Sequence, residues 1–317
     1  MFLTSTFQKI SAIRPLGSNE QMFWLLHRAC PGHFSLAIKI DGNIGLSEFQ
    51  RALNQMQQRH PLLRARIAVN AIGHPWFVED RNIEKIPLRH VQRQGEQHWQ
   101  QEVEYELSQP LRASRSPLIR AVLVHAPCVS EIILTCHHAI ADGISSTYLI
   151  RDILRTLSNP ESQLCALPIP LSLEENLPMG ILDKFRKNLT HDHNTSFIDS
   201  DESEDKPHNF EDYICTSACS LSKEMTAQLI SRCRHEQTSV HCAICASFLL
   251  TINAQDRTKP TASLLICGTA VDLRRYLKKV DIRDVGVYSF ALISSHMIGK
   301  RTNFWDLARS LKYQLNE

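Results

Sequence analysis

Two adjacent histidines, followed closely by an aspartate and a glycine, form the segment of this sequence best suited to chemistry. The residues HHAIADG occupy His137–Gly143. Histidine titrates near neutral pH, so an imidazole here can accept a proton from a hydroxyl or amine and return it to a leaving group. Asp142 can orient the loop or tune the imidazole, and Gly143 permits a sharp turn and a close approach. These residue types suit acyl transfer through a tetrahedral oxyanion.

The segment needs a strand before it and a helix after it. Residues Glu131–Cys136 predict a strand that leads into the first histidine. Ser145 and Ser146 can cap a helix that runs to about Leu157. The amino end of such a helix offers free N–H groups and a positive dipole where negative charge would develop.

The remaining sequence predicts an α/β protein with two lobes. The first lobe spans residues 1–175, an acidic connector spans 176–212, and a partial second lobe spans 213–317. The connector is poor in apolar residues, so we expect a solvated linker around a short helix at Met179–Leu189. The other helices are expected at Ser18–Arg28, Leu46–Arg59, Gly95–Ser108, Ser222 onward, Ser239–Ile252 and Phe304–Leu315, and the other strands at Phe34–Ile40, Leu63–Val69, Trp76–Glu79, Leu118–His125, Tyr213–Ser217, Ser263–Val271 and Val285–Ser294.

Composition and charge indicate which partners and which cellular location to expect. The chain has 317 residues, 43% of them hydrophobic, and a formal net charge of +2 without a basic cluster, so we expect no nucleic-acid partner. The longest nearly apolar stretch, Cys242–Ile252, is too short to span a membrane. The first residues lack the apolar core of a secretory signal, so the ten cysteines are expected to be reduced in a cytoplasmic protein.

Metal and cysteine chemistry are the weaker interpretations. His137, His138 and Asp142 are possible ligands, but neighbouring residues at a strand end point in opposite directions and no further strong ligand follows closely. We therefore expect no metal. Cys136 ends an alternating strand and should pack inward rather than act as a nucleophile. A zinc site is disfavoured because cysteine is a common core residue of apolar helices; its possible ligands are Cys215, Cys219, His241, Cys242 and Cys245.

HHAIADG resembles the HHxxxDG signature of the chloramphenicol acetyltransferase-like superfamily. That group includes nonribosomal peptide synthetase condensation domains, plant alcohol acyltransferases and polyketide-associated acyltransferases. The DFGWG segment of the plant branch is absent here. Other segments resemble the family in the same order: SNEQMFWLL at Ser18–Leu26, QQRHPLLRARI at Gln57–Ile67, SPLIRAVLV at Ser116–Val124, VDLRRYL at Val271–Leu277 and VGVYSF at Val285–Phe290, the last two most closely in the polyketide-associated acyltransferases.

The resemblance implies roles for individual residues. His138 would be the general base, or would position the acceptor or stabilise the oxyanion, and His137 would be structural. Asp142 would form an ion pair that holds the loop, with Arg274 as its partner. Gly143 would keep a channel open for the pantetheine arm of the donor. The fold implied is an α+β sandwich of two chloramphenicol acetyltransferase-like lobes, with donor and acceptor entering opposite ends of a tunnel between them.

The implied donor is an acyl-CoA or a phosphopantetheinyl carrier protein, and the acceptor is a small alcohol or amine. No bound cofactor is expected. The sequence stops at Glu317, one helix after VGVYSF, whereas family members continue, so an incomplete C-terminal lobe is expected. Two functions stay open: an acyltransferase, and a truncated noncatalytic module that binds a carrier protein or another partner. The acyl chain and the acceptor also stay open.

Overall fold

The computed structural model describes residues 11–30, 32–161, 164–177, 197–198, 214–255, 262–277, 280–281 and 283–316. These residues fall into two compact units. The first takes in the chain up to Ser217 and also Leu273–Tyr288, and the second consists of Ala218–Asp272 and Ser289–Glu317. The expected helix at Met179–Leu189 and most of the acidic connector at 176–212 lie outside the described residues.

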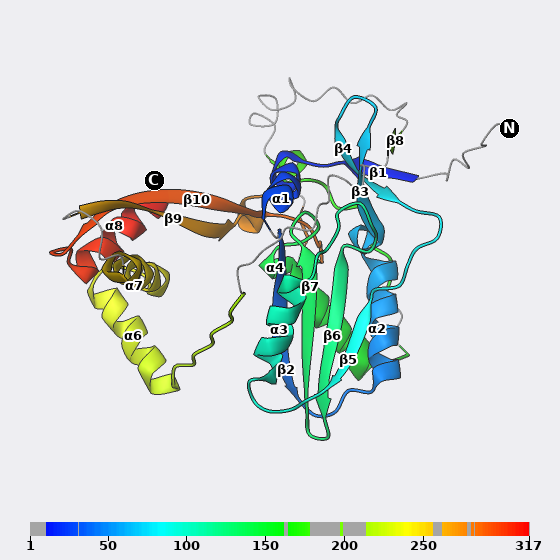
Figure 1. Ribbon diagram of the computed structural model, residues 1–317, viewed down its shortest axis with the longest axis horizontal. Helices are drawn as coiled ribbons and strands as arrows, with labels where there is room; N and C mark the ends of the chain where they lie inside the picture. Colours follow the sequence, from blue (N-terminus) through cyan, green and yellow to red (C-terminus); the bar gives the residue numbers. More distant parts are fainter. Residues whose placement is uncertain are drawn as a thin grey trace. The chain divides into compact units, whose positions relative to one another are not determined.

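A four-stranded sheet carries the histidine motif in the first unit (Figure 1). Its strands lie in the order β2 (His33–Asp41), β7 (Val129–His137), β6 (Ile119–Ala126) and β5 (Leu88–Gln92). β5 runs parallel to β6, and the other neighbours are antiparallel. The long pairing of β7 between β2 and β6 fixes the position at which the strand ends and the motif begins.

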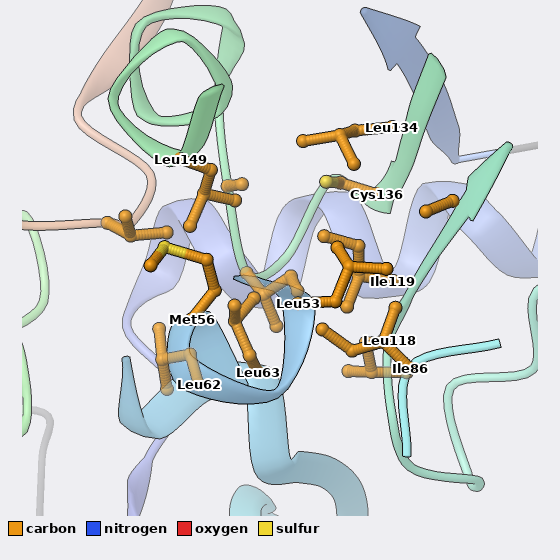
Figure 2. Close-up of a cluster of buried hydrophobic side chains, with 14 of the residues drawn as sticks. Leu53, Met56, Leu62, Leu63, Ile86, Leu118, Ile119, Leu134, Cys136 and Leu149 are labelled. Atoms are coloured by element: carbon orange, nitrogen blue, oxygen red, sulfur yellow. The ribbon is translucent and has the colours of Figure 1, made fainter. Parts of the chain in front are cut away.

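Helices cover both faces of this sheet because its strands alternate between two apolar faces. α2 (Leu46–Arg59) and α4 (Gly143–Ser158) pack on one face, and α3 (His98–Ser108) packs on the other. Figure 2 shows Leu53 and Met56 of α2 and Leu149 of α4 gathered near Leu134 and Cys136 of β7. Burial in this core raises the pKa of the Cys136 thiol to about 12, so the thiol stays protonated and packs inward.

A second sheet completes the first unit. Its order is β1 (Ser11–Pro15), β4 (Pro75–Glu79), β3 (Ala65–Asn70) and β8 (Phe197–Ile198), all antiparallel. α1 (Ser18–Ala29) follows β1 directly, and short 3₁₀ helices lie at Pro61–Arg64, Glu174–Asn176 and Arg274–Tyr276 among the described residues.

The described residues of the second unit form a two-stranded antiparallel sheet and three helices. β9 (Ala262–Asp272) pairs with β10 (Ser289–Gly299), and the helices are α6 (Lys223–His235), α7 (Val240–Gln255) and α8 (Phe304–Asn316). Its core includes Cys242, Leu249, Ile298 and Leu311, so Cys242 has a packing role. Among the described residues, no helix combines the length and the apolarity needed to cross a membrane.

Two strand predictions are wrong in detail. The strand expected at Val285–Ser294 begins only at Ser289, because Val285–Tyr288 packs with the first unit instead of continuing the hairpin. The part of Tyr213–Ser217 that the structure describes, residues 214–217, forms no strand. Its backbone is tied to α3 instead, since the N–H of Thr216 donates to Glu104 at 2.6 Å.

Candidate active site

His137 ends β7 as a fully buried, neutral side chain. It pairs in register with His33 of β2, and its Nδ1 accepts a hydrogen bond from the N–H of Ala139 at 3.1 Å. Because that nitrogen acts as an acceptor, the ring proton sits on Nε2. Burial holds the pKa of His137 well below its usual value, and the charges of the neighbouring histidines, among them His27, act in the same direction. His137 therefore stays buried and uncharged next to His138.

His138 comes next, and two aromatic rings clamp its imidazole. The ring stacks on Phe23 of α1, with centroids 4.1 Å apart and planes 6° apart, and it tilts against Phe34 of β2 at 4.5 Å. Its backbone N–H donates to the carbonyl of Gly32 at 2.8 Å. Nδ1 is buried, whereas the residue is partly exposed, which leaves Nε2 as the accessible nitrogen.

The surroundings of His138 keep its imidazole neutral. Burial lowers the pKa of His138, while nearby backbone groups and the charge of Asp142 only partly oppose that effect. A neutral ring has a free lone pair at one nitrogen at pH 7. The accessible Nε2 can carry that lone pair, so His138 has the form that a proton acceptor requires.

Asp142 caps α4 and is held from several directions. Its Oδ1 accepts the N–H of Ser145 at 2.8 Å and Nη2 of Arg274 at 2.9 Å. Its Oδ2 accepts Nη1 of Arg274 at 3.0 Å and the N–H of Tyr288 at 2.9 Å. The predicted cap by Ser145 or Ser146 is wrong, because the helix begins at Gly143 and the Asp142 carboxylate occupies the capping position.

The hydroxyl of Ser145 ties the same segments together. It donates to the carbonyl of Gly286 at 2.7 Å and accepts the N–H of Gly286 at 3.0 Å and Nη2 of Arg274 at 2.8 Å. The Arg274 guanidinium also lies over the rings of Tyr288 at 4.9 Å and Tyr148 at 5.6 Å. Leu273–Tyr288 is thus fastened to the start of α4 by charged and neutral hydrogen bonds.

Two family models match this chain. The condensation domain model matches residues 32–168, and the model of the phthiocerol/phthiodiolone dimycocerosyl transferase C-terminus matches residues 213–317. The resemblance to condensation domains that the sequence predicted is thus confirmed.

Curated relatives that match this chain are synthetases of far greater length. Chondramide synthase of Chondromyces crocatus is 26% identical over 156 residues, which cover 47% of this chain and 4% of the relative. A linear gramicidin synthase chain of Brevibacillus parabrevis is 28% identical over 169 residues, which cover 49% of this chain and 3% of the relative. The chain thus spans only a few per cent of these relatives.

Several solved structures share the fold of this chain. Polyketide synthase associated protein 5 from Mycobacterium tuberculosis aligns with a TM-score of 0.64 at 19% identity, over 97% of this chain and 73% of that protein. The first condensation domain of the calcium-dependent antibiotic synthetase, in complex with a substrate analogue, aligns with a TM-score of 0.68 at 16% identity, over 96% of this chain and 74% of that one. The predicted α/β class with chloramphenicol acetyltransferase-like lobes is confirmed.

The HHAIADG segment thus lies with Arg274, Phe23 and Phe34 in the first unit. Gly143 opens α4, and a Cβ added there would meet no atom within 4 Å beyond its chain neighbours and its own helix. Sequence reasoning missed the ring clamp of Phe23 and Phe34 and the hydroxyl of Ser145. Phe23 lies in the segment SNEQMFWLL, and Gly286, which bonds to Ser145, lies in the segment VGVYSF. Both segments resemble the family in sequence, but that resemblance did not predict the contacts. Among the described residues, no group of three histidine, cysteine or acidic side chains is placed to hold a metal ion.

Proposed function

We propose that this chain transfers an acyl group from a thioester to an alcohol or amine, with Nε2 of His138 as the general base. The observation that carries the proposal is the neutral imidazole clamped between Phe23 and Phe34 with its Nε2 accessible. The acyl donor is a CoA thioester or a phosphopantetheinyl carrier protein. Condensation-family synthetases, which use carrier-bound thioesters, support this donor class.

The proposed acyl transfer needs only one base, and its bonds and protons balance. The acceptor oxygen or nitrogen attacks the thioester carbonyl while His138 takes the proton of the acceptor. The tetrahedral intermediate then collapses, the carbon–sulfur bond breaks, and the imidazolium returns the proton to the departing thiolate. The products are the ester or amide, a free thiol and the original neutral histidine. Such a base contributes about 10²- to 10⁴-fold in rate, and orientation of the two substrates supplies more.

The carboxylate of the motif has a positioning role in this scheme. Both oxygens of Asp142 are taken up by Ser145, Arg274 and the backbone of Tyr288. They therefore have no hydrogen bond with His138, and the carboxylate does not act as the orienting group of a catalytic triad. It holds the loop and the start of α4 in place, and it supplies a negative charge that makes a protonated His138 less costly.

The test compares His138→Ala and His138→Gln with wild type. A panel of acyl-CoA and acyl-pantetheine thioesters is incubated with alcohols and amines, the free thiol is followed colorimetrically, and the product is identified by mass spectrometry. Both variants should lose about 10²-fold or more in kcat/KM while their circular dichroism stays unchanged. His90→Ala is the matched control, because His90 is exposed on β5. Transfer by His138→Ala at the wild-type rate would refute the assignment.

The pH profile gives a second readout. Because the pKa of His138 is lowered, kcat/KM should stay level from pH 8 to below the usual histidine value of about 6.5, and should fall only at lower pH. If wild type transfers nothing to any acceptor but binds a phosphopantetheinylated carrier protein, the chain is a noncatalytic binding module.

A further inference from the structure

Two cysteine thiols meet in the second unit, where α7 packs against β9 (Figure 1). Cys245 lies on α7 and Cys267 lies on β9, and their side chains are within hydrogen-bonding distance of each other. Both residues are half-buried at the edge of the core to which Cys242 belongs. A small reagent from solvent can therefore reach this pair, whereas Cys233 and Cys242 are only 1% and 2% exposed.

His241 lies beside this pair of thiols. Its Nε2 is 3.5 Å from Sγ of Cys245 and 3.3 Å from Oγ1 of Thr269. His241 and Cys245 are neighbours on one side of α7, because they are four positions apart. Thr269 and Cys267 share one face of β9, because they are two positions apart. The contact between His241 and Cys245 is exposed to solvent, so the imidazole can take a proton from the thiol and pass it to water.

The two thiols lose their protons one after the other. Burial, the charge of Cys267 and a hydrogen bond with Cys267 together raise the pKa of Cys245 to about 11. A negative charge on Cys267 thus keeps Cys245 protonated, and the pair offers one thiolate beside one neutral thiol. The thiolate is the form of cysteine that attacks an oxidant, and the neighbouring thiol is placed to complete a disulfide.

We propose that Cys245 and Cys267 form a reversible disulfide when the protein meets hydrogen peroxide, with His241 as the base for the Cys245 thiol. The Cys267 thiolate attacks one oxygen of the peroxide, the O–O bond breaks, and the departing hydroxide combines with the proton that Cys267 released. The Cys245 sulfur then attacks the sulfenic acid at Cys267 while its proton passes to His241. The S–O bond breaks, the S–S bond forms, and the departing hydroxide takes the proton from His241. Two thiols together lose two electrons, and the peroxide is reduced to two molecules of water.

The disulfide fastens α7 to β9. It closes a loop of about 20 residues, and cross-linking such a loop restricts the unfolded chain and so stabilises the folded one. Local opening of α7 becomes rarer as a result, so its amide protons should exchange about ten-fold or more slowly in the oxidised protein. A dithiol reductant returns both cysteines to the reduced form by thiol–disulfide exchange. This redox site makes the second unit responsive to oxidation and does not depend on the proposed acyl transfer.

The test is peptide mapping of the full chain after oxidation. The reduced protein is treated with hydrogen peroxide, its free thiols are alkylated, and it is digested without reduction for tandem mass spectrometry. Peptides joined through Cys245 and Cys267 should appear, and dithiothreitol should separate them. Cys245→Ser and Cys267→Ser should each lack the cross-link, and His241→Ala should form it about ten-fold or more slowly, because a positioned base is lost. The matched control is Cys219→Ser, which alters an exposed cysteine of the same unit and should form the cross-link as wild type does.

Hydrogen exchange of α7, followed by mass spectrometry, tests the consequence of the cross-link. Exchange should slow in oxidised wild type and stay unchanged in peroxide-treated Cys267→Ser. The proposal is overturned if peroxide oxidises the chain without joining Cys245 to Cys267, whether by linking Cys242 instead or by converting the two thiols to sulfinic acids that dithiothreitol does not reverse. It is also overturned if His241→Ala forms the cross-link at the wild-type rate, or if the cross-linked protein exchanges the amides of α7 as fast as the reduced protein does.

Discussion

Replacing Asp142 by alanine removes the group that fastens Leu273–Tyr288 to the start of α4. The carboxylate accepts four hydrogen bonds: one from Ser145, two from Arg274 and one from Tyr288. The side chains of Asp142 and Arg274 are 2% and 9% exposed, so water does not readily replace the lost partner. The substitution therefore removes the carboxylate that makes two hydrogen bonds with the buried guanidinium of Arg274.

The structure sets the size of the effect. Removing one partner of a buried ion pair costs about 3–5 kcal/mol, because the other charge stays desolvated. Arg274 keeps the hydroxyl of Ser145 at 2.8 Å and the nearby ring of Tyr288. We therefore expect the lower end of that range, a loss of about 3 kcal/mol in the free energy of unfolding of the first unit.

The assay is urea unfolding followed by tryptophan fluorescence. Trp24, Trp76 and Trp99 belong to the first unit and Trp305 to the second, so a Trp305→Phe background reports on the first unit. Soluble yield gives a simpler comparison. Asp142→Ala should reduce it more than His138→Ala does, because His138 makes no ion pair within the described residues.

Two controls make the reasoning refutable. Asp281→Ala breaks an ion pair with Arg283 in the same segment, but both side chains are about half exposed, so the loss should stay under about 1 kcal/mol. The double variant Asp142→Ala with Arg274→Met should cost less than the sum of the single changes, because no unpaired buried charge remains. An Asp142→Ala variant as stable as Asp281→Ala, or strictly additive costs, would refute the buried-pair argument.

Two further predictions concern His33 and Gly143. Burial lowers the pKa of His33 to about 4, below the unfolded value of about 6.5, so the free energy of unfolding drops by up to about 3 kcal/mol as pH falls between these values. In urea unfolding at pH 7 and pH 4.5, His33→Gln should make the free energy of unfolding less dependent on pH. A pH dependence equal to that of wild type would contradict this prediction. A Cβ at position 143 meets no other atom within 4 Å, so Gly143→Ala should fold as wild type does, and circular dichroism should show that Gly143→Leu also stays folded. Gly143→Leu should nevertheless lower kcat/KM for an acyl-pantetheine donor about ten-fold, and equal rates would show that the donor arm does not pass the start of α4.

Local pattern was enough to predict several elements. The helix at Leu46–Arg59 has the predicted bounds, because its apolar residues recur at helical spacing and Pro61 follows its end. The strand leading into the motif was predicted at Glu131–Cys136 and is found at Val129–His137. Both signals are carried by side chains close together in the chain.

Elements that depend on distant partners were not predicted. β5 was missed, because its residues Leu88–Gln92 have little pattern of their own and are held as a strand by parallel pairing with β6. The start of β10 was placed too early, since Val285–Tyr288 reads as a strand continuation but is drawn to α4 by Ser145 and Asp142. Packing across the fold overrides local propensity at both places.

The sequence by itself gave the resemblance to condensation domains and nominated the chemistry, because HHAIADG and the segments that resemble that family in order are properties of residue type and spacing. Only the tertiary structure decided the state of those residues. The lowered pKa of His138 follows from burial, in a site whose rings come from α1 and β2. Asp142 meets an arginine 132 positions away, and such a contact arises from the folded path of the chain rather than from any local pattern.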